Sequence, residues 1–353
     1  MKIFRVVWAA VLSLFLLSVV VNSQTAGTVS TASNPSYGVY YNGEVYFIAQ
    51  GAGELQVIKG DQIVSTVKLP GYPNPFRLAV LNGSIYVVYQ DGPLIELNGD
   101  GQVVWNYTVP EVGKYPAIIS AGGYIVVTAS NGDEVYFITL SHQVRSVTVM
   151  PYPQALAYDN YTDVVYVGGY GGDSIYGISL SDFKVVQNIT LNVSSVEAMA
   201  FVPPDLLAVA PGHHHFEVVN LTDGKVVAFV SLPYTIGAIN GYAWMCYIPY
   251  DHYIALSVPH DSDTVVIFNA EGNVVEEVTV GNSPNGIVYD PQDHYIYVMD
   301  YGSSTVSYFP APPPQETTKT LKAPDYTPFV IATVAAVVVL AAIGAFLFTR
   351  RGK

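Results

Sequence analysis

Two groups of histidine and aspartate side chains could bind a metal ion. One is the run HHH, and the other is the stretch HDSD about 45 residues later. The candidate ligands are His213, His214, His215, His260, Asp261 and Asp263. Imidazole and carboxylate groups are ligands that zinc and copper accept, although this spacing fits no recognised ligand pattern. A divalent metal is the one cofactor these residues suggest. The alternative is that they are polar residues of solvated turns.

Other patterns that would indicate catalysis are absent from the sequence. It contains no Gly-x-Ser-x-Gly elbow, no phosphate-binding loop and no His-Glu-x-x-His helix. Glu276 and Glu277 are adjacent, so in a strand they face opposite sides and form no acid–base pair. His252 and His294 each follow a predicted turn, and we expect them to cap it. The sequence therefore predicts no catalytic residue.

Short strands separated by tight turns must position these side chains. A first turn recurs seven times, at intervals of about 40 residues: 41–44, 81–84, 121–124, 159–163, 203–205, 250–252 and 291–294. Four strands per interval of this length are typical of a β-propeller. A β-sandwich or two small all-β domains would explain the strands but not the even spacing. We therefore predict an all-β, seven-bladed β-propeller.

The last unit contains only three predicted strands. The stretch TAGTVSTAS, residues 25–33, has strand-like composition and belongs to no unit. We expect it to supply the outer strand of the last blade, because such a closure removes an exposed sheet edge.

The clearest unit, GNSPNGIVYDPQDHYIYVMDYGSSTVSYF (281–309), resembles the YVTN repeat of seven-bladed propellers. It has the Gly-x-x-Pro-x-Gly start, an Asp-Pro turn, a Tyr-Val strand and a Ser-x-x-Val strand, although YVMD stands in place of Tyr-Val-Thr-Asn. Residues 162–180 are the second-best copy. The resemblance implies a fold and carries no catalytic residues, because propellers host many unrelated functions.

Alternating strands determine which turns lie together. The second turn of each blade and the connections between blades should lie on one side of the ring, called here the second-turn side. The first and third turns should lie on the opposite, first-turn side. Residues His213–His215 and His260–Asp263 then occupy second turns of the fifth and sixth blades. Ligands of propellers tend to bind on that side, where a few tyrosines could also stack on sugar rings.

The two ends of the chain predict export and anchoring. Residues 1–23 resemble a signal peptide, with a membrane-spanning helix as the less favoured alternative. Residues 24–309 form the propeller ectodomain, 310–328 a Pro/Thr-rich stalk, 329–348 a transmembrane helix and 349–353 a basic cytoplasmic tail. A removable glycolipid-anchor signal would end apolar, whereas this chain ends in TRRGK.

The ectodomain is strongly acidic. It has seven Lys or Arg against twenty-six Asp or Glu, a formal net charge of −19, so we exclude a nucleic-acid partner. The single cysteine, Cys246, cannot form an internal disulfide. Six sequons are candidate glycosylation sites: Asn82, Asn106, Asn160, Asn188, Asn192 and Asn220. Most fall on the first-turn side or in outer strands, which leaves the second-turn side bare.

These features resemble archaeal surface proteins and predict a single-pass membrane protein whose propeller lies outside the cell. The favoured function is a binding module for protein, envelope or glycan partners. The alternative is a metal- or cofactor-dependent propeller enzyme that uses the His213–His215 and His260–Asp263 face. A third reading is a structural partner in a surface lattice.

Overall fold

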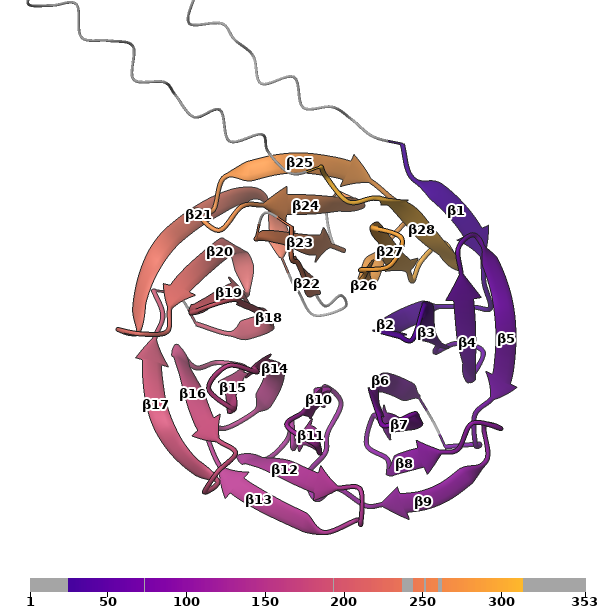
Figure 1. Cartoon of the computed structure of the whole chain (residues 1–353), viewed down its shortest axis with the longest axis horizontal. Helices are drawn as coiled ribbons and strands as arrows, with labels where there is room; N and C mark the ends of the chain where they lie inside the picture. The colour runs from indigo at the N-terminus through magenta and orange to yellow at the C-terminus, as the bar shows by residue number, and fades with distance from the viewer. Residues whose placement is uncertain are drawn as a thin grey trace, which may run out of the picture. The chain divides into compact units, whose positions relative to one another are not determined.

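The described residues form a ring of seven antiparallel sheets. The computed structural model describes residues 25–313 except 73, 193, 237–243, 251, 260 and 261 and the side chain of His213. Each sheet has four strands, and the seven sheets surround a common axis (Figure 1). The described residues belong to one compact unit. The predicted all-β, seven-bladed propeller is therefore confirmed.

Each blade follows the chain from the axis to the rim. Blade 1 contains β2 (Pro35–Tyr41), β3 (Glu44–Ala49), β4 (Glu54–Lys59) and β5 (Gln62–Lys68). Blade 2 contains β6 (Pro75–Leu81), β7 (Ser84–Tyr89), β8 (Leu94–Leu97) and β9 (Val103–Tyr107). Blade 3 contains β10 (Ile118–Ala121), β11 (Tyr124–Thr128), β12 (Glu134–Thr139) and β13 (Val144–Thr148). Blade 4 contains β14 (Pro153–Asp159), β15 (Val164–Gly169), β16 (Ser174–Ser179) and β17 (Lys184–Thr190).

The remaining blades keep this order until the last one. Blade 5 contains β18 (Val196–Val202), β19 (Leu206–Pro211), β20 (His213–Asn220) and β21 (Lys225–Ile236). Blade 6 contains β22 (Met245–Ile248), β23 (Tyr253–Val258), β24 (Thr264–Phe268) and β25 (Val274–Thr279). Blade 7 contains β26 (Pro284–Asp290), β27 (Tyr295–Asp300), β28 (Thr305–Pro310) and β1 (Gly27–Ser30).

Blade 7 is completed by a strand from the start of the described chain. Strand β1 pairs antiparallel with β28, with Gly27 opposite Tyr308 and Ser30 opposite Thr305. The figure shows β1 on the rim, next to β28 (Figure 1). The predicted closure is confirmed, and it satisfies the edge of β28 that would otherwise be unpaired.

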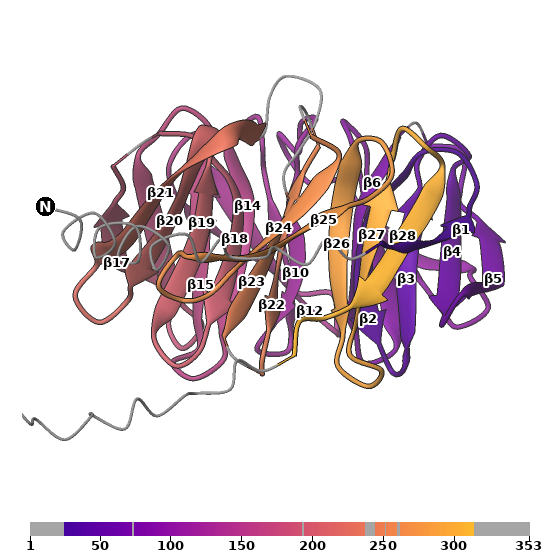
Figure 2. The same cartoon turned by 90° about the horizontal axis from the view of Figure 1, so that it is seen from above.

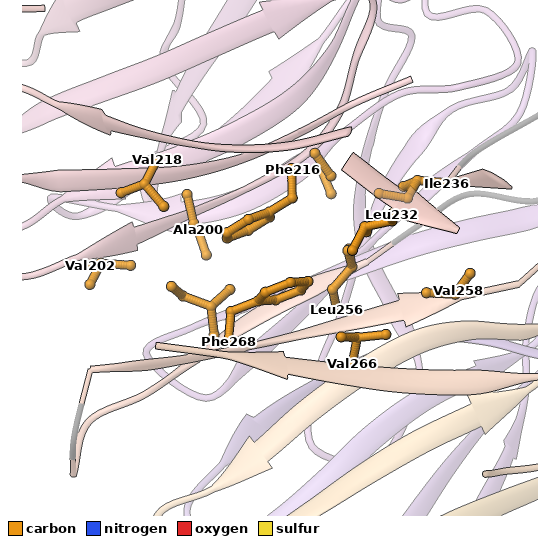
Figure 3. Close-up of a cluster of buried hydrophobic side chains, with 14 residues drawn as sticks. Ala200, Val202, Phe216, Val218, Leu232, Ile236, Leu256, Val258, Val266 and Phe268 are labelled. Carbon is orange, nitrogen blue, oxygen red and sulfur yellow. The ribbon is translucent and has the colours of Figure 1, made fainter. Parts of the chain in front are cut away.

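The hydrophobic core lies between neighbouring blades. The second strand of blade 4, β15, is buried at every position, whereas its outer strand β17 is mostly exposed. Between blades 5 and 6 the rings of Phe216 and Phe268 are parallel, with centroids 4.2 Å apart, inside a cluster of aliphatic side chains (Figure 3). Each blade therefore buries its faces only by contact with its neighbours, which explains why the sequence repeats.

The first turns have the predicted conformations. Asn42 and Asn82 both have φ 52° and are followed by glycines at φ 85° and 84°, as a type I′ hairpin requires. In blades 6 and 7, His252 and His294 each form a 2.9 Å hydrogen bond with a tyrosine hydroxyl of the preceding strand. These two histidines cap their turns, as predicted.

The last described residues leave the ring on the first-turn side. The amide of Ala311 donates to the carbonyl of His294, in the first turn of blade 7 (2.8 Å). Figure 2 shows the ring edge-on, with turns on its two opposite sides. Within the described part of the chain, no helix is long and apolar enough to cross a membrane. The predicted signal peptide, the transmembrane helix (329–348), the tail and most of the stalk lie outside the described residues.

Candidate functional site

Five inner strands start with a β-bulge on the second-turn side. The irregularity lies at the first residues of β2, β6, β14, β18 and β26. Four of these strands begin with proline, which suits a first strand position because its missing N–H is not needed there. A bulge bends the strand and changes the direction of a side chain. The inner strands therefore start with irregular backbone near the axis of the ring.

Arg77, the third residue of β6, joins three blades at this level. Its guanidinium carbon lies 3.8 Å from the ring centre of Trp244, which directly precedes β22 in blade 6. Its Nη1 donates to the carbonyl of Gln154 in blade 4 (3.1 Å). Arg77 is only 2% exposed. A residue of blade 2 therefore contacts blades 4 and 6 on the inside of the ring.

Arg77 is unusual among the Lys and Arg residues of the propeller. The other six are all exposed: Lys59, Lys68, Lys114, Arg145, Lys184 and Lys225. Burial of a charge is costly unless other groups compensate for it. The face of an indole ring is one such group, because its quadrupole attracts a cation.

A buried carboxyl group interacts electrostatically with the charge of Arg77. Glu197 is the second residue of β18 in blade 5 and is 8% exposed. Burial raises the pKa of Glu197 from its usual 4.5 to about 7, while the positive charge of Arg77 acts in the opposite direction. Burial outweighs the arginine, so Glu197 changes its charge near neutral pH.

These residues form what we call the axial cluster: Tyr37, Arg77, Gln154, Glu197 and Trp244. The rings of Tyr37 and Trp244 lie 4.7 Å apart, and both residues are half-buried. The Nε2 of Gln154 donates to the carbonyl of Val196, which connects blades 4 and 5 (3.2 Å). Half-buried aromatic rings beside an arginine, an amide and a carboxyl group suit recognition of a polar ligand with a flat face.

Three exposed tyrosines lie on the same side of the ring, at blades 2 and 4. Tyr72, Tyr152 and Tyr170 are 44%, 52% and 59% exposed. Tyr72 and Tyr152 lie in connections between blades, and the amide of Tyr170 in the second turn of blade 4 donates to the carbonyl of Tyr152 (2.9 Å). The second-turn side therefore combines buried polar groups with accessible aromatic rings.

The predicted place of the three histidines was wrong in one respect. Residues His213–His215 begin strand β20 rather than form a turn, and β20 pairs there with the long strand β21. The Nδ1 of His214, which is exposed, donates to the carbonyl of Tyr234 (2.8 Å). The ring of His215 lies 4.9 Å from the ring of Phe229. His214 and His215 thus contact different residues of β21.

The remaining described candidate ligand has a structural role. The carboxylate of Asp263 accepts hydrogen bonds from the amide of Ser283 (2.9 Å) and from the Nδ2 of Asn282 (3.2 Å). His260 and Asp261 lie outside the described residues. Among the described residues, no group of three or more His, Cys, Asp or Glu side chains could hold a metal ion. The predicted metal site therefore stays a prediction.

The sequons have the positions that the repeat predicts. Asn82 and Asn160 lie in first turns, and Asn220 ends β20 at a third turn. Asn106 and Asn188 lie in the outer strands β9 and β17 and are exposed. Of the six, Asn192 alone falls in a connection on the second-turn side.

Sequence patterns gave little indication of the axial cluster. Its members come from blades 1, 2, 4, 5 and 6 and belong to no motif. The available signal was the recurrence of proline at the start of inner strands, because the polar residues Arg77 and Gln154 directly follow such starts. The cysteine adds no nucleophile, since burial raises the pKa of the Cys246 thiol to about 12.

Comparison with known proteins supports the fold. No protein-family model matches the sequence, and no curated protein matches it. A structure of virginiamycin B lyase from Staphylococcus aureus has 15% identity and a TM-score of 0.68, covering 80% of this chain and 98% of that chain. A chain of the mitotic checkpoint complex has 10% identity and a TM-score of 0.71, covering 84% and 94%. Kuenenia stuttgartiensis hydrazine synthase has 16% identity and a TM-score of 0.68, covering 80% and 97%.

The class of this protein is thus the seven-bladed β-propeller. The similar structures belong to a lyase, a checkpoint complex and a hydrazine synthase. At these identities the likeness shows the fold alone, and function has to be argued from the site.

Proposed function

We propose that this protein is a binding module at the cell surface and that its second-turn side is the contact surface. The observation that carries this proposal is the axial cluster, whose buried polar groups lie on the same side of the ring as the exposed rings of Tyr72, Tyr152 and Tyr170. The chain leaves the ring on the opposite side. Three of the six sequons lie in turns on the opposite side, and two more lie in outer strands on the rim. Contacts with a protein, envelope or glycan partner would therefore meet neither the stalk nor most glycans.

Membrane anchoring and export belong to the same proposal. The sequence supports them through the signal-like residues 1–23, the apolar residues 329–348 and the basic end. Resemblance to YVTN repeats and to archaeal surface proteins supports a place outside the cell. Glycans at Asn82, Asn160 and Asn220 would then lie on the side opposite the contact surface, and those at Asn106 and Asn188 on the rim.

A new glycan on each side of the ring tests which side makes contacts. Asp133→Thr converts Asn131, in the second turn of blade 3, into a sequon, and Glu271→Thr does the same for Asn269 in a third turn. Asp133 and Glu271 are both exposed, so neither substitution removes a buried side chain. The full-length protein is produced in a glycosylating host and reconstituted in labelled proteoliposomes. Binding of these liposomes to immobilised envelopes of the source cells is then measured.

We expect the glycan at Asn131 to abolish binding and the glycan at Asn269 to leave it unchanged. Mass spectrometry of the glycopeptides verifies that both sites carry the glycan. Equal effects of the two variants, or no binding of the unmodified protein, would contradict the proposal.

A metal-dependent function is the second candidate, and one contact favours it. Because the Nδ1 of His214 donates to a backbone carbonyl, the Nε2 of the neutral ring carries the lone pair. This is the arrangement that metal-binding histidines commonly have. Metal analysis of the purified full-length protein, beside a His214→Ala/His260→Ala variant, tests it. Stoichiometric metal that is lost in the variant supports this function, and its absence from both proteins contradicts it.

A further inference from the structure

The residue directly before the inner strand has a left-handed backbone in five blades. Its φ angle lies between 53° and 69° at Asn34, Asn74, Tyr152, Ser195 and Ser283. Asparagine tolerates this conformation well, and serine is a small residue common in turns. For a bulky residue the same conformation is an outlier. Blade 4 therefore has a tyrosine where the equivalent positions have asparagine or serine.

The fold itself does not require a tyrosine at this position. The backbone of Tyr152 makes two hydrogen bonds that hold the connection: its amide donates to the carbonyl of Gly132 (2.8 Å), and its carbonyl accepts from the amide of Tyr170 (2.9 Å). An asparagine could form both. The side chain is 52% exposed, so burial offsets only part of the conformational cost. Strained residues of this kind are found at functional sites.

Tyr152 belongs to a series around the ring. The connections that lead into blades 2, 3 and 4 contain GYP, KYP and PYP, with Tyr72, Tyr115 and Tyr152 before the proline. The amide of Tyr115 donates to Ser130 Oγ in the second turn of blade 3 (2.9 Å). Tyr170 adds a second exposed ring in blade 4. We call Tyr72, Tyr115, Tyr152 and Tyr170 the tyrosine arc. Tyr72 and Tyr115 lie three residues before their inner strands and Tyr152 lies directly before its own, so three consecutive connections on the second-turn side each contain a tyrosine.

The chemistry of the arc indicates what it binds. A tyrosine ring offers an apolar face and a hydroxyl group, and it loses little conformational entropy on binding. A tyrosine in each of three consecutive connections suits a ligand that extends across several blades. The same side carries the exposed carboxylates of Glu111, Asp133 and Asp173 in an ectodomain with a net charge of −19, which disfavours an anionic polymer.

We propose that the tyrosine arc binds a linear, uncharged polysaccharide, whose sugar rings stack on the successive tyrosines. The proposal rests on the second-turn side being the contact surface. Each stacking contact is weak, so affinity comes from several contacts along one chain. Binding should therefore strengthen steeply with oligosaccharide length until the ligand spans the arc.

The experiment measures binding of the full-length protein in detergent to defined polysaccharides. The probes are cellulose, amylose, curdlan, mannan and chitin, with oligosaccharides of increasing length for any that binds. The variants are Tyr152→Asn and Tyr72→Asn. The matched control is Tyr161→Asn, because Tyr161 is 67% exposed in the first turn of blade 4, on the opposite side.

We expect each arc variant to weaken binding about tenfold, as the loss of one aromatic contact predicts, and the control to leave it unchanged. Tyr152→Asn should also raise the unfolding temperature, since asparagine tolerates the left-handed backbone better. A variant that is more stable and binds less tightly separates the role of the ring in binding from any role in folding.

Three results would overturn the proposal: no probe binds, the control loses as much affinity as the arc variants, or Tyr152→Asn lowers the unfolding temperature. If none of the probes binds while cell envelopes still bind through the second-turn side, the polysaccharide is wrong and the proposed function stands. If the envelopes do not bind either, both proposals fail.

Discussion

The guanidinium of Arg77 covers the ring of Trp244 at 3.8 Å, although the two residues belong to blades 2 and 6. Blades of a propeller normally contact only their immediate neighbours. Here one side chain adds contacts to two blades, 4 and 6, that do not adjoin its own. The two residues are far apart in the sequence, so this contact forms only when the intervening blades have assembled around the axis.

Replacement of Arg77 should destabilise the whole ring. Arg77→Ala removes the stacking on Trp244 and the hydrogen bond to Gln154, and it leaves Glu197 buried without the nearby positive charge. We expect the free energy of unfolding to fall by about 3 kcal/mol. Urea denaturation of the full-length protein measures the change. Lys184→Ala, at an exposed cation, should change it by less than about 0.5 kcal/mol, and comparable effects would contradict a special role for Arg77.

Glu197 should make stability depend on pH. Its pKa is about 7 in the folded protein and its usual value is 4.5, so the folded state binds more protons between these pH values. The contribution is fully present below about pH 4.5 and is lost as the pH rises towards 7. The loss amounts to at most about 3 kcal/mol.

Glu197→Gln isolates this contribution, because glutamine keeps the shape without the charge. Asp300 acts in the same direction, since burial raises its pKa from 3.8 to about 6. The measured quantity is therefore the difference between the two proteins in their free energies of unfolding across this pH range. Identical pH profiles for the protein and the variant would show that Glu197 is not the titrating group.

Gly27 should tolerate no side chain. A Cβ atom at Gly27 would lie 2.5 Å from the ring of Tyr308, which faces it across the β1–β28 pair. We expect Gly27→Ala to lower the free energy of unfolding by about 1–2 kcal/mol through overpacking. Gly99→Ala is the control, because a Cβ there meets nothing within 4 Å. Thermal denaturation of the two variants gives the comparison; equal shifts would mean that β1 does not restrain the last blade.

His142 and Glu96 should be energetically coupled. Their side chains are 2.7 Å apart, with Glu96 largely buried, and the imidazole of His142 stacks on Trp105 at 4.4 Å. Because the histidine comes from blade 3 and the other two residues from blade 2, the contact joins adjacent blades. A double-mutant cycle with alanine should give a coupling of about 1 kcal/mol.

The exposed pair Lys184 and Asp182, 3.2 Å apart, supplies the reference cycle. Its coupling should be below about 0.5 kcal/mol, because solvent screens exposed charges. If the two cycles gave the same value, the contact between blades 2 and 3 would add nothing to stability.

The architecture could be predicted from the sequence because the signals for its turns are local and recur in every blade. Asn-Gly pairs such as Asn42–Gly43 fix tight turns through residues close in the chain, and the spacing of these turns counts the blades. The last unit lacks a fourth strand in its own sequence, and this predicted that residues 25–33 supply it. The strand boundaries near the histidines could not be predicted from local turns. The outer strand β21 is twelve residues long, and its pairing extends β20 to include His213–His215.

The sequence by itself determined the number of blades, the turns and the strand that closes the ring, because each depends on short-range backbone preferences or on a count of repeats. Only the tertiary structure decided which polar side chains meet. Arg77, Gln154, Glu197 and Trp244 lie in four different blades and come together through ring closure, which no local pattern encodes. It also revealed that Tyr152 has a left-handed backbone and an exposed ring, since both depend on how neighbouring turns pack around it.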